Sequence, residues 1–157
     1  MAGYNYDAFS SKDYDFAGTT GPQAGEKAPD FVVSTSTGEV KNLLDFEGDF
    51  LVLEMGSLTC PLFQSRRRTM ETLDADDKRF SNVVLYFREA HPGADIPKHQ
   101  DFEAKLACAQ KLKTEDGETR LVLVDDFDGT VHKACLSASV RLNRGHLRMF
   151  GIGGCLE

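Results

Sequence analysis

Three short apolar runs dominate the hydrophobic pattern of this chain. They cover residues 50–55, 83–87 and 121–124, and they are rich in β-branched and aromatic side chains. Such runs lack the polar alternation of a half-exposed strand, which is typical of strands buried on both faces of a sheet. The pattern therefore predicts three buried strands, and a parallel arrangement is the natural one for them.

The two segments between these runs carry apolar residues at helical spacing. In the first segment, Pro61 stands where a helix tolerates a missing N–H, and Leu62 and Phe63 begin a partial apolar stripe. In the second segment, the spaced apolar residues are Phe102, Leu106, Ala109 and Leu112. An alternation of strand and helix implies right-handed crossovers and a parallel sheet that is covered by helices.

The flanks of this unit predict further elements. A turn at Gly38 between residues 32–33 and 40–44 favours a hairpin before the first buried strand. After the third strand, a segment from Val131 is predicted to add a helix, and residues 146–150 an edge strand. We therefore expect an α/β protein with the thioredoxin-like fold, in which a central mixed sheet has parallel core strands flanked by helices.

The two ends of the chain differ in character. Residues 1–24 are rich in Tyr, Asp, Ser, Gly and Thr and show no sustained apolar period, which predicts a flexible N-terminal arm. The thioredoxin-like domain is expected to cover residues 25–157, since a chain of 157 residues can bury enough surface for one α/β core.

Composition and charge narrow the classes of function. Hydrophobic residues make up 41% of the chain and the net charge is −7, which argues against a nucleic-acid partner. The one basic run, Arg66 to Arg68, is expected on the solvent face of a helix. No apolar stretch approaches the roughly 20 residues of a membrane span, and no secretory signal is recognisable at the N-terminus. Four scattered cysteines suit a reducing compartment, so we expect a cytoplasmic protein without membrane contact.

Cys60 is the strongest candidate for chemistry. It follows the first buried strand and precedes Pro61, so its sulfur should face the unpaired N–H groups of a helix N-terminus. That position favours the thiolate, and Ser57 and Thr59 add hydroxyl donors, which suits attack on a peroxide, a disulfide or a carbon-bound halogen. The alternative is a buried and inert cysteine. Phe63 occupies the position of the second cysteine of thioredoxin, so dithiol chemistry on this turn is excluded.

Other candidate groups complete no recognisable site in the sequence. Three further cysteines are open candidates for a resolving thiol: Cys108, Cys135 and Cys155. Cys155 would be the easiest to bring to Cys60, but all three can equally be bystanders. The pair of His91 and His99 lacks a full set of metal ligands, and so does the pair of His132 and Cys135. Acidic residues after the third strand are expected as turn and surface groups: Asp125, Asp126 and Asp128. We expect no bound cofactor and no metal, and an external thiol as reductant.

Three separated motifs occur in order along the chain: Gly56 to Phe63, Tyr86 to Pro92, and the segment from His99 to Ala107. Together they resemble the iodothyronine deiodinase family within the thioredoxin and peroxiredoxin superfamily. The resemblance runs from about residue 25 to about residue 136. It implies that Cys60 replaces the catalytic selenocysteine of the family.

The same resemblance implies roles for five more residues. Ser57 and Thr59 would be supporting hydroxyls, while Glu89, His91 and His99 would contact the substrate or handle protons.

The chain also departs from the family pattern. Leu58 stands where the family has a cysteine two positions before the nucleophile, and no proline follows Pro97. The segment 137–145 is short, so the family's substrate-binding arginine could fall on Arg141 or Arg144.

Three functions remain open at this point. The first is deiodinase-like reductive chemistry at a Cys60 thiolate, with a small-molecule substrate and a thiol reductant such as thioredoxin or glutathione. The second is a peroxiredoxin-like, antioxidant reduction of hydroperoxides at the same thiol. The third is a non-catalytic thioredoxin-like scaffold. The oligomeric state is open as well, a homodimer included.

Overall fold

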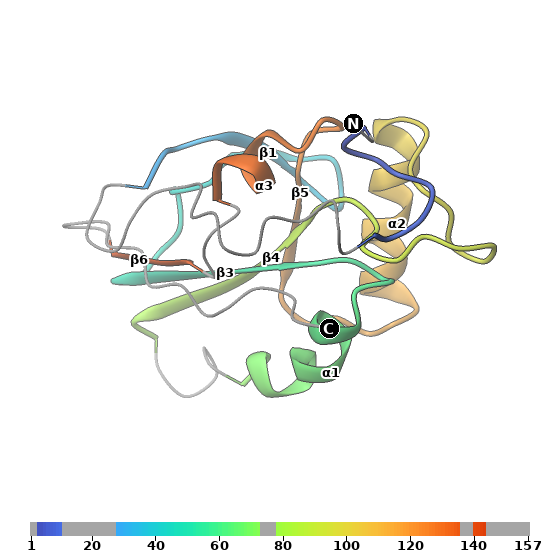
Figure 1. Cartoon of the computed structure of the whole chain (residues 1–157). Helices are drawn as coiled ribbons and strands as arrows, with labels where there is room; N and C mark the ends of the chain where they lie inside the picture. Colours follow the sequence, from blue (N-terminus) through green and yellow to red (C-terminus); the bar gives the residue numbers. More distant parts are fainter. Residues whose placement is uncertain (1–2, 11–27, 73–77, 136–139, 144–157) are drawn as a thin grey trace.

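The computed structural model describes residues 3–10, 28–72, 78–135 and 140–143. These residues form one six-stranded mixed sheet with helices on both of its faces (Figure 1). The strands are β1 (Val32–Thr35), β2 (Val40–Asn42), β3 (Phe50–Gly56), β4 (Phe80–Tyr86), β5 (Leu121–Val124) and β6 (Val140–Asn143). The helices are α1 (Pro61–Met70), α2 (Phe102–Thr114) and α3 (Thr130–Cys135).

The strand order is β2-β1-β5-β4-β3-β6. The three central strands β3, β4 and β5 are parallel, whereas β1, β2 and β6 pair antiparallel with their neighbours. This arrangement confirms the expected thioredoxin-like mixed sheet with parallel core strands. The predicted hairpin is also confirmed, with Gly38 at a φ of 85° in its turn.

Two hydrophobic cores lie on opposite faces of the sheet, because successive strand residues point to opposite sides. Val83 and Leu85 of β4 face the core that α3 covers, together with Val131 and Cys135. On the other face, the core includes Val84 and Tyr86 of β4, Phe63 of α1, and Ala109 and Leu112 of α2. Cys60 belongs to this second core, so the nucleophile candidate lies on the α1 and α2 side.

The two longer helices begin where their sequences allow. Cys60 is the N-cap of α1 and Pro61 occupies its first turn, as predicted. Asp101 caps α2, since its side chain accepts a hydrogen bond of 2.8 Å from the backbone N–H of Ala104. None of the described helices combines the length and the apolar character needed to cross a bilayer.

The expectation of a flexible arm over residues 1–24 is wrong for residues 3–10. Tyr6 is 8% exposed, and its hydroxyl donates a 2.7 Å hydrogen bond to the carbonyl of Ala90. The guanidinium of Arg88 lies over the rings of Tyr4 and Tyr6, at 4.9 and 4.6 Å from their centroids. Individual aromatic contacts of this kind leave no periodic signal in the sequence. Residues 11–24 lie outside the described residues.

The expectation of a solvated basic run is also wrong in part. Arg68 is exposed, but Arg67 is buried and donates to the carbonyl of Asp116. Arg66 is half-buried, and its Nε lies 2.5 Å from a carboxylate oxygen of the buried Glu54.

Asp125 is a further correction, because it is fully buried rather than a surface acid. Its carboxylate accepts hydrogen bonds from the backbone N–H groups of Val131 and His132, and so holds the start of α3. The final strand of the described sheet is β6, at residues 140–143, and the strand predicted over residues 146–150 lies outside the described residues.

Candidate active site

Cys60 lies at the start of α1, immediately after the loop that leaves β3. Its backbone is extended, with φ −87° and ψ 107°, and its carbonyl accepts the first helical hydrogen bond from Gln64. The side chain is 2% exposed and packs in the core beneath α1 and α2. The sulfur thus lies at the helix end that favours an anion, with little access to bulk water.

A single buried carboxylate, that of Glu89, organises the polar groups beside this loop. Its Oε2 accepts hydrogen bonds from both the backbone N–H (3.0 Å) and the hydroxyl (2.6 Å) of Thr59, the residue before Cys60. Its Oε1 accepts from the hydroxyl of Tyr86 and lies 3.2 Å from Nε2 of His99. Residues from the β3–α1 loop, from β4 and from the segment before α2 therefore meet at Glu89.

The hydrogen bonds around Glu89 set its protonation state. Burial raises the pKa of the Glu89 carboxyl, but hydrogen bonds from His99, Thr59 and Tyr86 outweigh burial and lower that pKa below its ordinary value. The pKa of the Tyr86 hydroxyl is raised well above 10 by burial and by the nearby Glu89 carboxylate. At neutral pH the cluster therefore holds an ionised carboxylate next to a protonated phenol.

Ser57 and His91 are held by the same loop but do not touch the Glu89 carboxylate. Ser57 is fully buried, and its Oγ accepts a 3.2 Å hydrogen bond from the backbone N–H of Ala90. His91 is exposed, and its backbone N–H donates to the Thr59 hydroxyl oxygen at 3.0 Å. The ring of His91 packs against the ring of Phe9 in a tilted arrangement, with centroids 4.4 Å apart.

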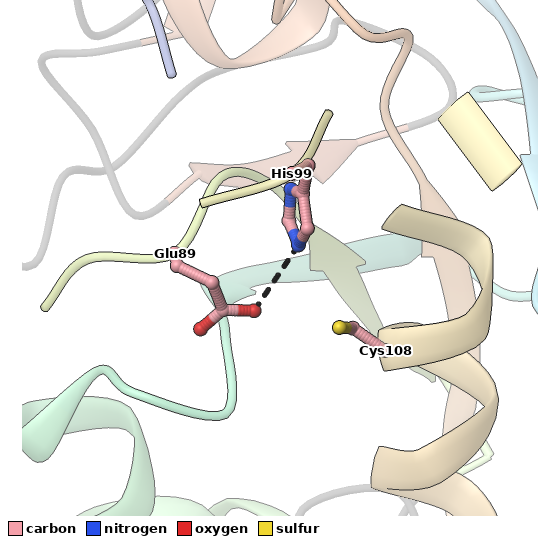
Figure 2. Close-up of side chains that lie close together, drawn as sticks. All are labelled: Glu89, His99 and Cys108. Carbon is pink, nitrogen blue, oxygen red and sulfur yellow. Dashed lines mark hydrogen bonds and ion pairs between the residues drawn. The ribbon is translucent and has the colours of Figure 1, made fainter. Parts of the chain in front are cut away.

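Figure 2 shows that Cys108 of α2 points toward Glu89 and His99. The Sγ of Cys108, a carboxylate oxygen of Glu89 and a ring nitrogen of His99 all lie within 4.8 Å of one another. Burial and the Glu89 charge raise the pKa of the Cys108 thiol. These three residues form the one group with metal-ligand spacing among the described residues.

The remaining candidates from the sequence lie elsewhere. Cys135 is buried in the core under α3, on the other face of the sheet, where burial raises its pKa to about 11. Arg141 belongs to β6, in register with Val52. Cys155 and Arg144 lie outside the described residues.

The structure therefore brings the six predicted site residues together around the loop that carries Cys60. Hydrogen bonds join four of them into one group: Thr59, Glu89, His91 and His99. Ser57 lies in the same loop and is bonded to the backbone of Ala90. Sequence reasoning did not place Tyr86 or Cys108 beside Glu89. The only signal for Tyr86 was its place in the Tyr86 to Pro92 motif. Cys108 was named only as one of three open candidates for a resolving thiol, since its distance from Glu89 depends on how α2 packs on the sheet.

Comparison with solved structures shows which proteins share the fold of this chain. A thiol:disulfide interchange protein DsbE, described as putative, from Chlorobium tepidum matches with a TM-score of 0.62 at 20% identity, covering 83% of this chain and 86% of that one. A peroxiredoxin-like protein from Aquifex aeolicus matches with a TM-score of 0.57 at 14% identity, covering 85% and 78%. These matches and the strand order of the sheet show the thioredoxin-like fold.

The sequence comparison narrows the class to a family. The iodothyronine deiodinase family matches over residues 9–143, and the chain belongs to that family. A thyroxine 5-deiodinase from Gallus gallus is 33% identical over 102 residues, which is 57% of this chain and 40% of that protein. One from Aquarana catesbeiana is 34% identical over 101 residues, or 56% and 38%. The chain spans about two fifths of the length of these curated relatives.

Proposed function

We propose that this protein is a thiol-dependent enzyme that removes iodide reductively from an iodinated phenol, with Cys60 as the nucleophile. One observation carries the proposal. The buried Glu89 carboxylate links Thr59, next to Cys60, to Tyr86 and His99. A network that can relocate a proton beside a thiol suits a reaction that must supply a proton to a carbon atom.

The reaction balances as a two-electron reduction of the substrate. The Cys60 thiolate attacks the iodine atom, the carbon–iodine bond breaks, and the aryl carbon takes a proton while a sulfenyl iodide forms on Cys60. One external thiol then displaces iodide to give a mixed disulfide. A second thiol releases the Cys60 thiol and leaves as the disulfide of the reductant.

The network around Glu89 supports this chemistry because it combines groups that can donate a proton with a group that can accept one. The Tyr86 phenol holds its proton near neutral pH, whereas Glu89 accepts hydrogen bonds from it and from Thr59. The ring of His99 lies 3.2 Å from Glu89 and can return a proton to the network after each reaction. It comes from the segment before α2, outside the β3–α1 loop. The Thr59 hydroxyl is the group of this network that lies next to the nucleophile Cys60. We therefore assign to it the final transfer, in which the proton reaches the aryl carbon.

His91 is assigned to substrate contact rather than to proton transfer. Its ring is exposed and lies against the Thr59 carbonyl and Phe9, away from the Glu89 oxygens. Replacing His91 by Ala should therefore raise KM more than it lowers kcat. Steady-state kinetics with an iodinated phenol give both constants.

The reductant in this proposal is an external thiol such as thioredoxin or glutathione. Cys135 is a poor resolving thiol, since it lies on the opposite face of the sheet from Cys60. The substrate is a small molecule, and the proposal needs no second subunit at the site.

Iodide release from an iodinated phenol, measured with a thiol reductant on wild type and Cys60→Ser, tests the proposal. We expect Cys60→Ser to lose at least about a thousandfold in rate, as removal of a nucleophile generally does. Cys135→Ala is the matched control and should retain the activity.

Two outcomes would contradict the proposed reaction. A wild-type protein that consumes hydrogen peroxide but releases no iodide would be a thiol peroxidase. A folded protein with neither activity would support the scaffold alternative.

A further inference from the structure

Three potential metal ligands converge from three separate parts of the chain. Glu89 follows β4, His99 precedes α2, and Cys108 lies within α2 (Figure 2). The ligand atoms of the three side chains lie within 4.8 Å of one another, and His99 Nε2 lies 3.2 Å from Glu89 Oε1. Because the packing of α2 on the sheet sets this convergence, the three groups are held without a ligand.

The donor set has the chemistry of a zinc site. Zn²⁺ binds carboxylate, imidazole and thiolate at roughly 2.0 to 2.3 Å, so the donors of a tetrahedral site stand roughly 3.3 to 3.8 Å apart. The spacing in this cluster needs only small side-chain shifts to reach that geometry. A set of one sulfur, one nitrogen and one oxygen favours Zn²⁺ over Mg²⁺ or Ca²⁺, which prefer oxygen ligands.

The charge of Glu89 also favours a cation. Glu89 is 2% exposed, and the residues that the structure describes provide it with no Lys or Arg partner. The donors around it are an amide, two hydroxyls and an imidazole. His99 is 3% exposed, and its Nε2 faces Glu89. A divalent ion bound between these side chains would place a positive charge beside a buried carboxylate.

We propose that Glu89, His99 and Cys108 bind a Zn²⁺ ion, with the fourth position open to water. Cys108 is half-buried, whereas Glu89 and His99 are buried. A bound Zn²⁺ would occupy both Glu89 and His99, the two groups that the proposed reaction uses for its proton. Occupancy would therefore inhibit iodide release, and this second part rests on the proposed function.

Titration of the reduced, full-length protein with Co²⁺ tests the site directly. Co²⁺ in a tetrahedral site with one thiolate gives visible d–d bands and a near-ultraviolet sulfur-to-cobalt band, and added Zn²⁺ should abolish both. Cys108→Ala should weaken the apparent affinity by at least about a hundredfold, more than the loss of an outer-shell partner. Cys135→Ala, which removes a buried thiol on the other face of the sheet, is the control and should bind like wild type.

A second variant distinguishes the loss of a metal ligand from the unfolding of the protein. Cys108→Asp keeps a ligand at the position but removes sulfur, so it should retain the d–d bands and lose the sulfur-to-cobalt band. Circular dichroism confirms that each variant is folded. A sulfur-to-cobalt band that survives in Cys108→Ala but disappears in Cys60→Ser would overturn the proposal, because the metal would then sit on the nucleophile.

Inhibition is measured in a single turnover of pre-reduced protein without added thiol, since thiols chelate Zn²⁺. The readout is the deiodinated phenol, because iodide stays on Cys60 as the sulfenyl iodide until an external thiol displaces it. We expect Zn²⁺ to suppress formation of the deiodinated phenol by wild type, and Cys108→Ala to need at least about tenfold more Zn²⁺ for the same effect. Tight binding without inhibition would overturn the regulatory part. Absence of the deiodinated phenol in every sample would count against the proposed function, while the Co²⁺ spectra would still decide the metal site.

Discussion

Two buried glutamates on the same side of the sheet have opposite kinds of partners. Glu54 of β3 is 2% exposed, and its two oxygens lie 2.5 Å from Nε of Arg66 and 2.6 Å from Nη1 of Arg120. Glu89 is equally buried, yet its partners are hydroxyl, amide and imidazole groups. The charge of Glu54 is therefore neutralised by two arginines, whereas Glu89 is stabilised by hydrogen bonds alone.

This difference separates a structural cluster from a reactive one. Arginine stays protonated at any ordinary pH, so the Glu54 cluster has one charge state and locks α1 to the sheet. Glu118, bonded to Nε of Arg120 at 2.8 Å, completes that cluster. Hydroxyl and imidazole partners can exchange protons with a carboxylate, so the cluster around Glu89 has several accessible states.

The position of each cluster in the sheet agrees with its assignment. Glu54 lies inside β3, in register with Val84 of the neighbouring parallel strand β4. Glu89 lies just beyond the carboxyl end of β4, at the edge where Cys60 also leaves β3. Sites in open α/β sheets form outside the carboxyl ends of parallel strands, because loops there can present side chains without breaking the sheet.

The largest effect should come from breaking the charged cluster. Glu54→Gln removes a carboxylate from the buried guanidinium of Arg120 and from the half-buried one of Arg66, which should lower the free energy of unfolding by about 3 kcal/mol. For a domain of this size the melting temperature should fall by about 6 to 12 °C. Thermal unfolding followed by circular dichroism measures it. An unchanged melting temperature would show that Glu54 is not a structural anchor.

Glu89→Gln should lower the rate of iodide release and leave the stability nearly unchanged, the opposite of Glu54→Gln. We expect about a hundredfold lower rate of iodide release, the usual contribution of a proton-transfer group, with a free energy of unfolding within about 1 kcal/mol of wild type. Kinetics and chemical denaturation of the same preparation give both values. Glu54→Gln, assayed below its melting temperature, is the matched control and should keep most of the activity. If both variants lose stability alike, the contrast between the two carboxylates fails.

Tyr86→Phe sharpens the comparison, because it removes one hydroxyl from the Glu89 cluster and leaves the ring in place. The lost hydroxyl donates to Glu89 and accepts from the backbone N–H of Leu58 at 3.3 Å. We expect about 1 kcal/mol lower stability and about a tenfold lower rate. A variant that matches wild type in rate would exclude Tyr86 from the proton network.

The smallest effect should be a pH dependence of stability that belongs to Glu89. Its pKa is lower in the folded protein than the ordinary value of 4.5. Its ionised form therefore stabilises the fold above pH 4.5, and this contribution is lost as the pH falls through the folded-state pKa. The difference in unfolding free energy between wild type and Glu89→Gln should be constant from pH 7 to 5.5 and should decrease below 4.5. A difference that grows in acid would reverse the assigned direction. Urea denaturation at several pH values measures it, and other titrating groups cancel in the difference.

Much of the architecture could be predicted from local pattern. The strands β3, β4 and β5, the helix starting at Pro61 and the N-cap position of Cys60 all follow from apolar runs and one proline, as the structure confirms. The N-terminal segment was predicted wrongly. Tyr4 and Tyr6 dock on Arg88, and such a contact over more than eighty positions has no trace in sequence periodicity.

The sequence by itself determined the order of the elements, the place of Cys60 and the motif that holds Glu89, because these depend on neighbours within a few residues. The tertiary structure alone decided which charges are paired. It placed Arg120 on Glu54 across 66 positions, and it placed Tyr86, His99 and Cys108 around Glu89. The physical reason is that burial and hydrogen bonding depend on how helices pack on the sheet, and that packing is a property of the whole chain.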